Sequence, residues 1–230
     1  LSRGLGDVYK RQLDNYSIRG NSGLALFGTN AAVNARIGAM RGYDLIILQY
    51  GLNVMSADVL HYGSYEKAFI KVINYMKRCF PNSSILVMGV CDRSTQRDGE
   101  FVTMPAVRGM IEAQRNAARE TGVAFWNTFE AMGGENSMVE FVRKNWAAKD
   151  YTHLGYAGGK FIAGKLVGNW MQGVEAEQQR RDRIEEERRK NEMLHYNRND
   201  TIPGTIETET ETDSDADADT TFTTNEFAQP

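Results

Sequence analysis

Residues 150–153 have the sequence Asp-Tyr-Thr-His, and their types and spacing are well suited to acid–base chemistry. An aspartate three residues before a histidine can turn back and accept the Nδ1–H of the imidazole. That hydrogen bond fixes the tautomer, leaves Nε2 free as a base and stabilises the imidazolium formed during a reaction. Asp150 and His153 are therefore a candidate orienter and general base, although a structural hydrogen bond or half of a metal site uses the same spacing.

Two turns could supply donors for the negative charge that develops during acyl transfer. Asn53 follows the apolar run 43–50, so its side-chain amide can lie at the end of a strand. Gly23 follows Asn21 and Ser22, and the lack of a side chain at a glycine lets a substrate approach its backbone N–H. Both groups could stabilise an oxyanion. Each is equally compatible with an ordinary turn, because Gly and Asn are common turn residues.

The elements that position these residues follow from an alternation of short apolar runs and amphipathic segments, which predicts an α/β domain. The runs predict buried parallel strands at 43–50, 85–90 and 123–126, with a short strand-like segment at 16–18. Apolar spacing predicts helices at 64–79, 105–120 and 136–148, and another that starts just after His153. We therefore expect a three-layer, doubly wound (flavodoxin-like) parallel sheet, with ligands beyond the carboxyl ends of the strands.

The three motifs occur in the order of blocks II, III and V of the SGNH hydrolases, also called GDSL esterases, and the chain resembles that family over roughly residues 14–170. The resemblance implies that Gly23 and Asn53 form the oxyanion hole. It also implies that His153 is the general base and acid and that Asp150 orients it. No metal and no organic cofactor is implied, since a serine, this pair and the oxyanion donors suffice.

A narrower resemblance is to bacterial SGNH proteins of the peptidoglycan O-acetylesterase kind. It is carried by Gln-Arg at 114–115, Phe-Trp at 125–126, Ala-Met-Gly-Gly at 131–134 and Ser-Met at 137–138. In those proteins the Met-Gly-Gly stretch borders the active-site crevice. The resemblance implies a small-molecule or glycan ester as substrate, and it favours a periplasmic or cell-envelope location.

Block I of the family, Gly-Asp-Ser with the nucleophile, is absent. Residues 6–8 are Gly-Asp-Val, which has Val where Ser is required and lies too close to Gly23 for the intervening helix and strand. Residues 1–12 resemble translated sequencing-adapter DNA, so we expect a non-native leader, with the nucleophile and the first strand of the sheet encoded upstream. Ser17 and Ser22 are the alternatives within the chain, although each also fits a strand end or a turn.

Composition and charge divide the chain after the leader into three segments. We expect a partial SGNH domain at 13–172, a charged helical extension with Glu-Arg pairs at spacing four at 173–198, and a disordered acidic tail at 199–230. The whole chain has a formal charge of −3, whereas the tail has no Lys or Arg, so the remainder carries about +6. The acidic residues of the tail are Asp200, Glu207, Glu209, Glu211, Asp213, Asp215, Asp217, Asp219 and Glu226.

Several protein classes are not indicated by the composition. The positive surplus is spread without an aromatic-interleaved basic patch, so the sequence does not indicate nucleic-acid binding. No apolar run approaches the ~20 residues that span a bilayer. Cys79 and Cys91 are too few for a disulfide scaffold and fit core positions.

The leading hypothesis is a serine esterase that removes acyl groups, acetyl above all, from a carbohydrate through an acyl-enzyme. A non-catalytic carbohydrate- or envelope-binding module with the SGNH fold is the first alternative. A metal-dependent hydrolase with Asp150 and His153 as ligands is the second. It is the weaker one, because His61 and His195 lie in segments without ligand-like spacing.

The acidic tail is predicted to be dispensable for folding. Apart from Phe222 and Phe227 it offers almost no apolar anchor, so it cannot bury enough area to offset the entropy of ordering the chain. Truncation after Asn199 should leave the melting temperature in a thermal unfolding scan nearly unchanged. A large fall would show that the tail packs on the domain.

Overall fold

The computed structural model describes residues 13–18 and 20–199, so the leader at 1–12 and nearly all of the acidic tail lie outside the described residues. The chain divides into two units, whose described parts are residues 13–175 and 176–199, and each is treated by itself. Among the described residues, no helix is long and apolar enough to cross a membrane.

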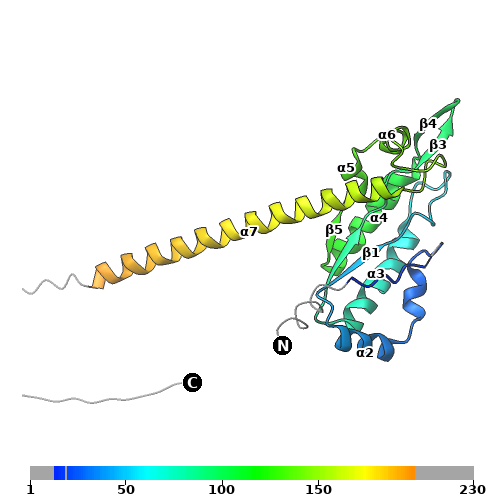
Figure 1. Ribbon diagram of the computed structural model, residues 1–230. Helices are drawn as coiled ribbons and strands as arrows, with labels where there is room; N and C mark the ends of the chain where they lie inside the picture. Colours follow the sequence, from blue (N-terminus) through cyan, green and yellow to red (C-terminus); the bar gives the residue numbers. More distant parts are fainter. Residues whose placement is uncertain (1–12, 19, 200–230) are drawn as a thin grey trace, which may run out of the picture. The chain divides into compact units, whose positions relative to one another are not determined.

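The first unit alternates helices and strands (Figure 1). In chain order its elements are the 3-10 helix η1 (Leu24–Gly28), α2 (Ala31–Arg41), β1 (Leu45–Gln49), α3 (Gly63–Cys79), β2 (Ser84–Met88), β3 (Ser94–Arg97), β4 (Glu100–Thr103), α4 (Ala106–Thr121), β5 (Ala124–Trp126), α5 (Thr128–Met132), α6 (Ser137–Arg143) and the start of α7 (Tyr156–Asn199). Strands β1, β2 and β5 form a parallel sheet in the order β1-β2-β5, and β3 pairs with β4 in an antiparallel hairpin.

The sheet is the middle of three layers. Successive residues of a strand point to opposite faces, so the side chains of β2 show which helices cover each face. On β2, Ile85 and Val87 pack into a core with α3 and α4, whereas Leu86 and Met88 pack into a second core with α5, α6 and α7. The predicted α/β fold with a parallel sheet is therefore confirmed. Cys79 and Cys91 are buried without a disulfide.

The strand register shows that the three parallel strands end at the same edge of the sheet. Gln49 of β1 lies opposite Met88 of β2, and Met88 lies opposite Trp126 of β5. All three strands are parallel, so the segments that follow these residues leave the sheet at the same carboxyl edge. This edge is the place where a doubly wound sheet binds its ligands.

A buried glutamine on α4 joins two of these strand ends. Gln114 is completely buried, its Nε2 donates to the carbonyl of Tyr50 at 2.7 Å, and its Oε1 accepts from the N–H of Val90 at 2.9 Å. A Cβ added at Gly51 would lie 2.8 Å from this Nε2, and Gly51 has a φ of 103°, so both space and backbone conformation require glycine. The amide therefore fixes the turns that follow β1 and β2.

Two of the predicted elements are wrong or too long. Residues 16–18 form no strand: they have no strand partner among the described residues, and Tyr16 is exposed. The helix expected at 136–148 ends at Arg143, because Asn145 adopts a left-handed φ of 57° and the N–H of Trp146 turns back to the carbonyl of Phe141 at 2.7 Å. Helices α3 and α4, in contrast, match the predicted ranges to within one residue.

The β3–β4 hairpin was not predicted, although the sequence contains its signal. Its two-residue turn is Asp98-Gly99, and both residues have positive φ, 52° and 86°. Asp-Gly is a strongly favoured sequence for this tight turn, since it tolerates positive φ at both positions. The flanking strands are only four residues long and mostly polar, so apolar periodicity does not reveal them.

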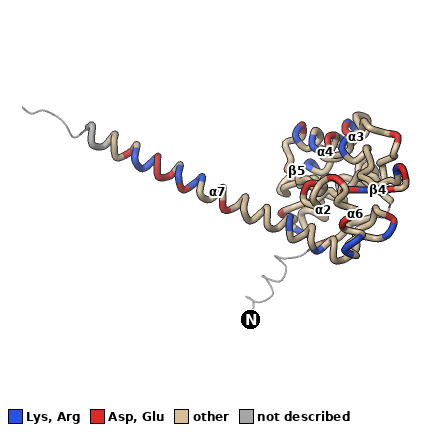
Figure 2. The backbone as a smooth tube through the Cα atoms, turned by 90° about the horizontal axis from the view of Figure 1, so that it is seen from above, with Lys and Arg blue, Asp and Glu red and all other residues tan. Residues whose placement is uncertain are grey.

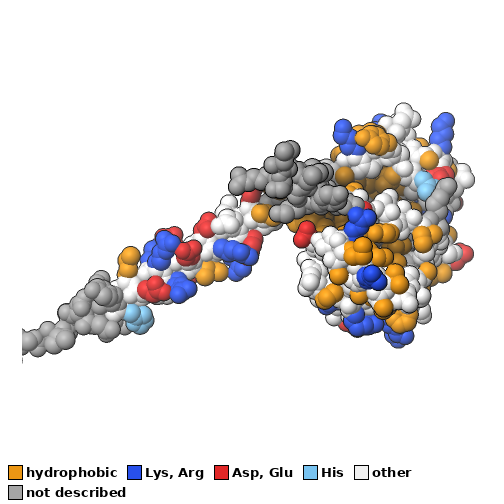
Figure 3. Space-filling model, turned by 60° about the horizontal axis from the view of Figure 1, so that its bottom comes forward, with side chains coloured by type: hydrophobic (Ala, Val, Ile, Leu, Met, Phe, Trp, Pro, Cys, Tyr) orange, Lys and Arg blue, Asp and Glu red, His pale blue; other side chains and the backbone are white. Residues whose placement is uncertain are grey.

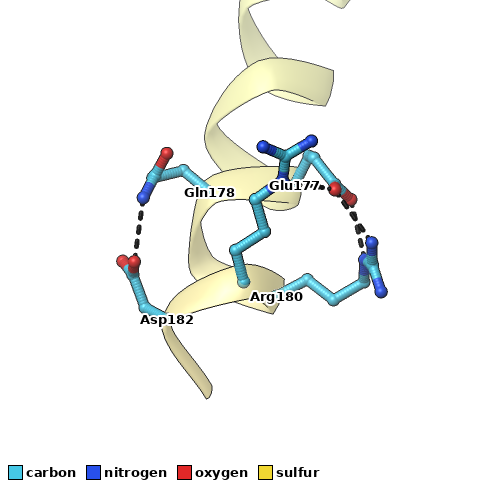
Figure 4. A network of polar contacts seen from close by, with 5 residues as sticks. Glu177, Gln178, Arg180 and Asp182 are labelled. Carbon is cyan, nitrogen blue, oxygen red and sulfur yellow. Dashed lines mark hydrogen bonds and ion pairs between the residues drawn. The ribbon is translucent and has the colours of Figure 1, made fainter. Parts of the chain in front are cut away.

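In the second unit the described residues are helical, and charged side chains of both signs follow one another along the helix (Figure 2). The Glu177 carboxylate accepts hydrogen bonds from Arg180 and Arg181, which lower its pKa to about 2, and Gln178 donates to Asp182 at 2.8 Å (Figure 4). Pairs at spacing four stabilise an exposed helix without a packed face. Further pairs are Glu185–Arg189, Glu186–Lys190 and Arg188–Glu192.

Apolar side chains remain exposed on the first unit (Figure 3). Ile47 of β1 is 41% exposed, although strands of a parallel sheet are normally covered on both faces. Strand β1 also has no partner on its second edge among the described residues. On α7, Val167, Trp170 and Val174 are about half exposed as well. In the described part of the sheet, Ile47 is therefore an incompletely covered apolar residue on a strand with an open edge.

Replacing Gln114 by Leu should destabilise the protein by about 2–4 kcal/mol. The substitution keeps the side-chain bulk but leaves the buried carbonyl of Tyr50 and the N–H of Val90 without their partner, at ~1–3 kcal/mol each. Urea unfolding measures the loss. The exposed Gln178→Leu on α7 is the control and should change stability by no more than about 0.5 kcal/mol. Equal stability of the two variants would show that the Gln114 bridge is unimportant.

Candidate active site

The loop between α6 and α7 brings Asp150 and His153 into direct contact. Nδ1 of His153 lies 2.7 Å from Oδ2 of Asp150. Oδ1 of the same carboxylate accepts the backbone N–H groups of Thr152 and His153, each at 3.0 Å. Nε2 of the imidazole has no hydrogen-bond partner among the described residues. The pair thus has the geometry of an oriented base whose second nitrogen is available.

The same contacts keep the carboxylate charged. The backbone N–H of His153, then its imidazole and then the backbone N–H of Thr152 lower the pKa of Asp150 to about 2. The Asp150 side chain is half exposed, so solvent screens the interaction and its contribution to stability is small. Its importance is electrostatic, because a carboxylate that is ionised at all ordinary pH values stabilises an imidazolium beside it.

The loop is held by the β3–β4 hairpin and by a hydrogen bond within the loop itself. The ring of Tyr151 stacks on Phe101 of the β3–β4 hairpin, with centroids 3.6 Å apart and the planes within 10°. The carbonyl of Tyr151 accepts the N–H of Ser94 at 3.0 Å, and the carbonyl of His153 accepts the N–H of Ala148 at 2.8 Å. Tyr151 has a left-handed φ of 53°, which costs energy in a residue with a bulky side chain, so these contacts maintain an unfavourable backbone conformation.

Gly23 and Asn53 lie close together, and both contact Asn21. Nδ2 of Asn53 donates to the carbonyl of Asn21 at 3.4 Å, and the N–H of Gly23 donates to Oδ1 of Asn21 at 2.7 Å. Gly23 has a φ of 86°, and a Cβ there would lie 2.6 Å from the ring of Tyr50. Glycine is therefore required at this turn, and the two predicted oxyanion donors are currently bonded to Asn21.

Hydrogen bonds made by two consecutive residues after β2 connect the Asn53 turn to the His153 loop. Nη1 of Arg93 lies 3.4 Å from the carbonyls of Leu52 and Met55, on either side of Asn53. The next residue, Ser94, makes the hydrogen bond to Tyr151 described above. The segments that carry Asn53 and His153 therefore lie at the same carboxyl edge of the sheet.

Asp92 and Arg93 are residues of this edge that the sequence analysis missed. Asp92 is completely buried, its Oδ2 accepts the N–H of Met138 at 2.8 Å, and its Oδ1 has no hydrogen-bond partner among the residues that the structure describes. Burial raises the pKa of this carboxyl, with the hydrogen bonds acting in the opposite direction. Two adjacent charged residues shortly after the buried strand β2 were the available signal. Asp92 connects the segment after β2 to the start of α6.

Neither candidate serine contacts the imidazole. Oγ of Ser22 accepts the N–H of Leu24 at 3.3 Å, its carbonyl accepts the hydroxyl of Tyr65 at 3.1 Å, and Ser17 lies in an exposed segment. Within residues 13–18 and 20–199 no serine hydroxyl is hydrogen-bonded to His153. In the same part of the chain no group of three or more His, Cys, Asp or Glu side chains could hold a metal ion, and neither His61 nor His195 completes such a group with Asp150 and His153.

Comparison with solved structures shows which fold the first unit has. The chain is similar to a peptidoglycan O-acetylesterase, with 24% sequence identity and a TM-score of 0.56 over 67% of this chain and 44% of that protein. The chain thus spans less than half the length of that esterase. The chain therefore has the fold of that esterase, which is the fold that the resemblance implied.

Weaker similarities are found to two other solved structures. A carbohydrate esterase family 3 protein from Talaromyces cellulolyticus has 17% identity and a TM-score of 0.46, covering 68% of this chain and 70% of its own. A GDSL-like lipase from Parabacteroides merdae has 13% identity and a TM-score of 0.43, covering 60% and 66%. No protein-family model and no curated protein matches the sequence.

The Asp150 carboxyl should titrate with a midpoint of about 2 in carboxyl ¹³C NMR. Its folded pKa is lowered, so its stabilising contribution is present above the ordinary aspartate range and is lost as the pH falls towards 2. In His153→Ala the midpoint should rise only part of the way to the ordinary value, because the backbone N–H groups of residues 152 and 153 still donate. Asp150→Asn identifies the signal, and an ordinary midpoint in the unmodified chain would contradict the hydrogen-bonding scheme.

Proposed function

We propose that this chain carries the Asp-His part of a serine esterase that removes acyl groups, acetyl above all, from a carbohydrate. The observation that carries the proposal is the 2.7 Å hydrogen bond between His153 and Asp150, placed at the ligand-binding edge of an SGNH/GDSL esterase-like fold with Nε2 available. The acetyl group and the glycan are supported by the similarity to a peptidoglycan O-acetylesterase.

In the proposed reaction, Nε2 of His153 takes the proton of a serine hydroxyl while the oxygen attacks the ester carbonyl. The ionised Asp150 stabilises the imidazolium, which then gives its proton to the leaving alkoxide of the sugar as the carbon–oxygen bond breaks. Water repeats the sequence on the acyl-serine and releases the acid. The role of the protein is thus to move one proton back and forth at a single imidazole.

The oxyanion would be bound by the N–H of Gly23 and by Nδ2 of Asn53. Both donors contact Asn21 at present, so the substrate oxygen must take the place of the Asn21 contacts. The exchange replaces a neutral acceptor with a charged one, and hydrogen bonds to charged acceptors are the stronger ones. This preference favours the rearrangement when the negative charge develops.

We place the nucleophilic serine on a segment outside residues 13–199. The lack of a described serine at His153 supports this placement, and so does the open edge of β1. A further parallel strand along that edge would end beside the turn of Asn53, because the carboxyl ends of parallel strands meet at one edge of the sheet. The same segment could cover Ile47, which is otherwise exposed.

The 230-residue chain alone should not turn over an aryl acetate, whereas the chain with its upstream coding segment restored should. In that longer protein His153→Ala should abolish the activity, and Asn53→Ala should lower kcat by roughly 10²–10³, the usual loss for an oxyanion donor. His195→Ala, an exposed histidine on α7, is the matched control and should retain full activity. Steady-state release of the aryl alcohol measures the activity of all five proteins.

Three results would overturn this proposal in different ways. Ordinary enzymatic rates from the 230-residue chain would require a serine within it, and loss of those rates in Ser22→Ala would identify that serine. A longer protein that binds a glycan but has another residue in place of the serine would be a binding module. Loss of activity with a chelator would favour the metal-dependent hydrolase.

A further inference from the structure

A groove of about 570 Å³ lies beside the first turns of α7, away from the groups used in the proposed reaction. It is lined by Trp146, Ala157, Lys160, Phe161, Gly164 and Lys165. The rings of Trp146 and Phe161 have centroids 4.9 Å apart and planes tilted by 32°, and the ring of the buried Phe141 lies edge-on to both. The rings of Trp146 and Phe161 therefore form an aromatic floor of the groove, and the buried ring of Phe141 packs against both of them.

Two ammonium groups lie over the rings of this floor, and a third lysine is exposed on the lining. Nζ of Lys144 lies 4.9 Å from the ring centroid of Trp146, and Nζ of Lys165 lies 5.5 Å from that of Phe161. Lys160 is exposed on the lining. In the described part of the chain none of the three forms an ion pair with a carboxylate. A cation above a ring keeps N–H donors directed away from it, so the groove offers positive charge beside two aromatic surfaces.

The groove is attached firmly to the segment that carries His153. The carbonyl of Trp146 accepts the N–H of Gly155 at 2.8 Å, and a Cβ added at Gly158 would lie only 2.3 Å from that carbonyl oxygen. The start of α7 thus packs directly on the backbone of Trp146. A ligand in the groove would be held at a fixed position relative to the active-site loop, which spans the residues between the two walls.

We propose that this groove is a subsite for a negatively charged sugar unit of a glycan. A carboxylate on the sugar pairs with the lysines and draws their ammonium groups from the rings that they cover. The C–H face of the sugar then packs against the electron-rich face of an aromatic ring in their place. The volume is within the range of small-molecule sites, which are mostly apolar with a few polar groups. The combination selects the ligand class: an inorganic anion leaves the rings unused, and a neutral sugar leaves the lysines unused.

The proposal deepens the proposed function by naming the charge of its substrate, and it rests on that function only for the bond that is cleaved. Binding itself does not require the serine or the oxyanion donors. A binding measurement on the 230-residue chain therefore tests the groove independently of esterase activity.

The test is calorimetric titration of the full chain with tetragalacturonate, a charged oligosaccharide, and with neutral xylotetraose. The charged probe should bind at least tenfold more tightly, and its Kd should rise with salt, because the lysines are exposed and screened. The double variant Lys160→Gln/Lys165→Gln should raise the Kd of tetragalacturonate at least tenfold. Lys67→Gln/Lys71→Gln, which makes the same charge change on α3 across the sheet, should leave that Kd unchanged.

A second variant tests the aromatic floor. Phe161→Leu keeps an apolar side chain of similar bulk and should weaken tetragalacturonate binding several-fold, with the melting temperature as the check on folding. Equal affinity for the two probes, or a Kd indifferent to Lys160 and Lys165, would overturn the proposal. So would an acidic hexapeptide that binds as tightly as tetragalacturonate, because charge alone would then suffice. Sugar binding without esterase activity in the longer protein would reject the proposed function and leave the groove standing.

Discussion

The geometry of the carboxyl edge of the sheet depends on one buried amide. Parallel strands end at the same edge of a sheet, but the turns that follow them have no ladder to fix them. Gln114 provides that support by bonding the backbone after β1 and after β2 from a fully buried position. A residue with one donor and one acceptor on the same group is required, since the two turns present a carbonyl and an N–H. The turn of Asn53 and the segment of Arg93 are therefore placed relative to each other before any substrate arrives.

The pattern of apolar residues in the sequence correctly predicted the elements that are held in place by burial of their apolar side chains. The run at 85–90 is buried between two helical layers, and periodicity of 3.6 located α3 and α4, so local pattern and tertiary packing agree there. The run at 43–50 contains the expected strand β1, but of its residues only Leu48 is buried. The segment 16–18 has the same composition as a strand but no neighbour to pair with in the described chain, and composition alone cannot supply one. The end of α6 was missed because a left-handed Asn145 stops it, and periodicity does not report such a residue.

Sequence predicted the pairing of Asp150 with His153 because the two residues belong to one turn. It could not predict what holds that turn, since Phe101 and Ser94 come from a hairpin far away in the chain. It also could not foresee that Asn21 bonds both Gly23 and Asn53, because that arrangement depends on how two separate turns meet. The assignment of roles to these residues remains a prediction, whereas their positions are now described.

The three-residue separation of Asp150 and His153 has a consequence for how an active constellation forms. Loop-closure entropy grows with the length of chain that must be brought together, and here the acid and the base close a loop of a single turn. The contact adds almost nothing to contact order and can form early in folding. Of the groups in the proposed reaction, only the nucleophile and the oxyanion donors require distant chain segments to meet this turn. Assembly of the complete site then has fewer long-range steps than one in which acid, base and nucleophile all come from separate elements.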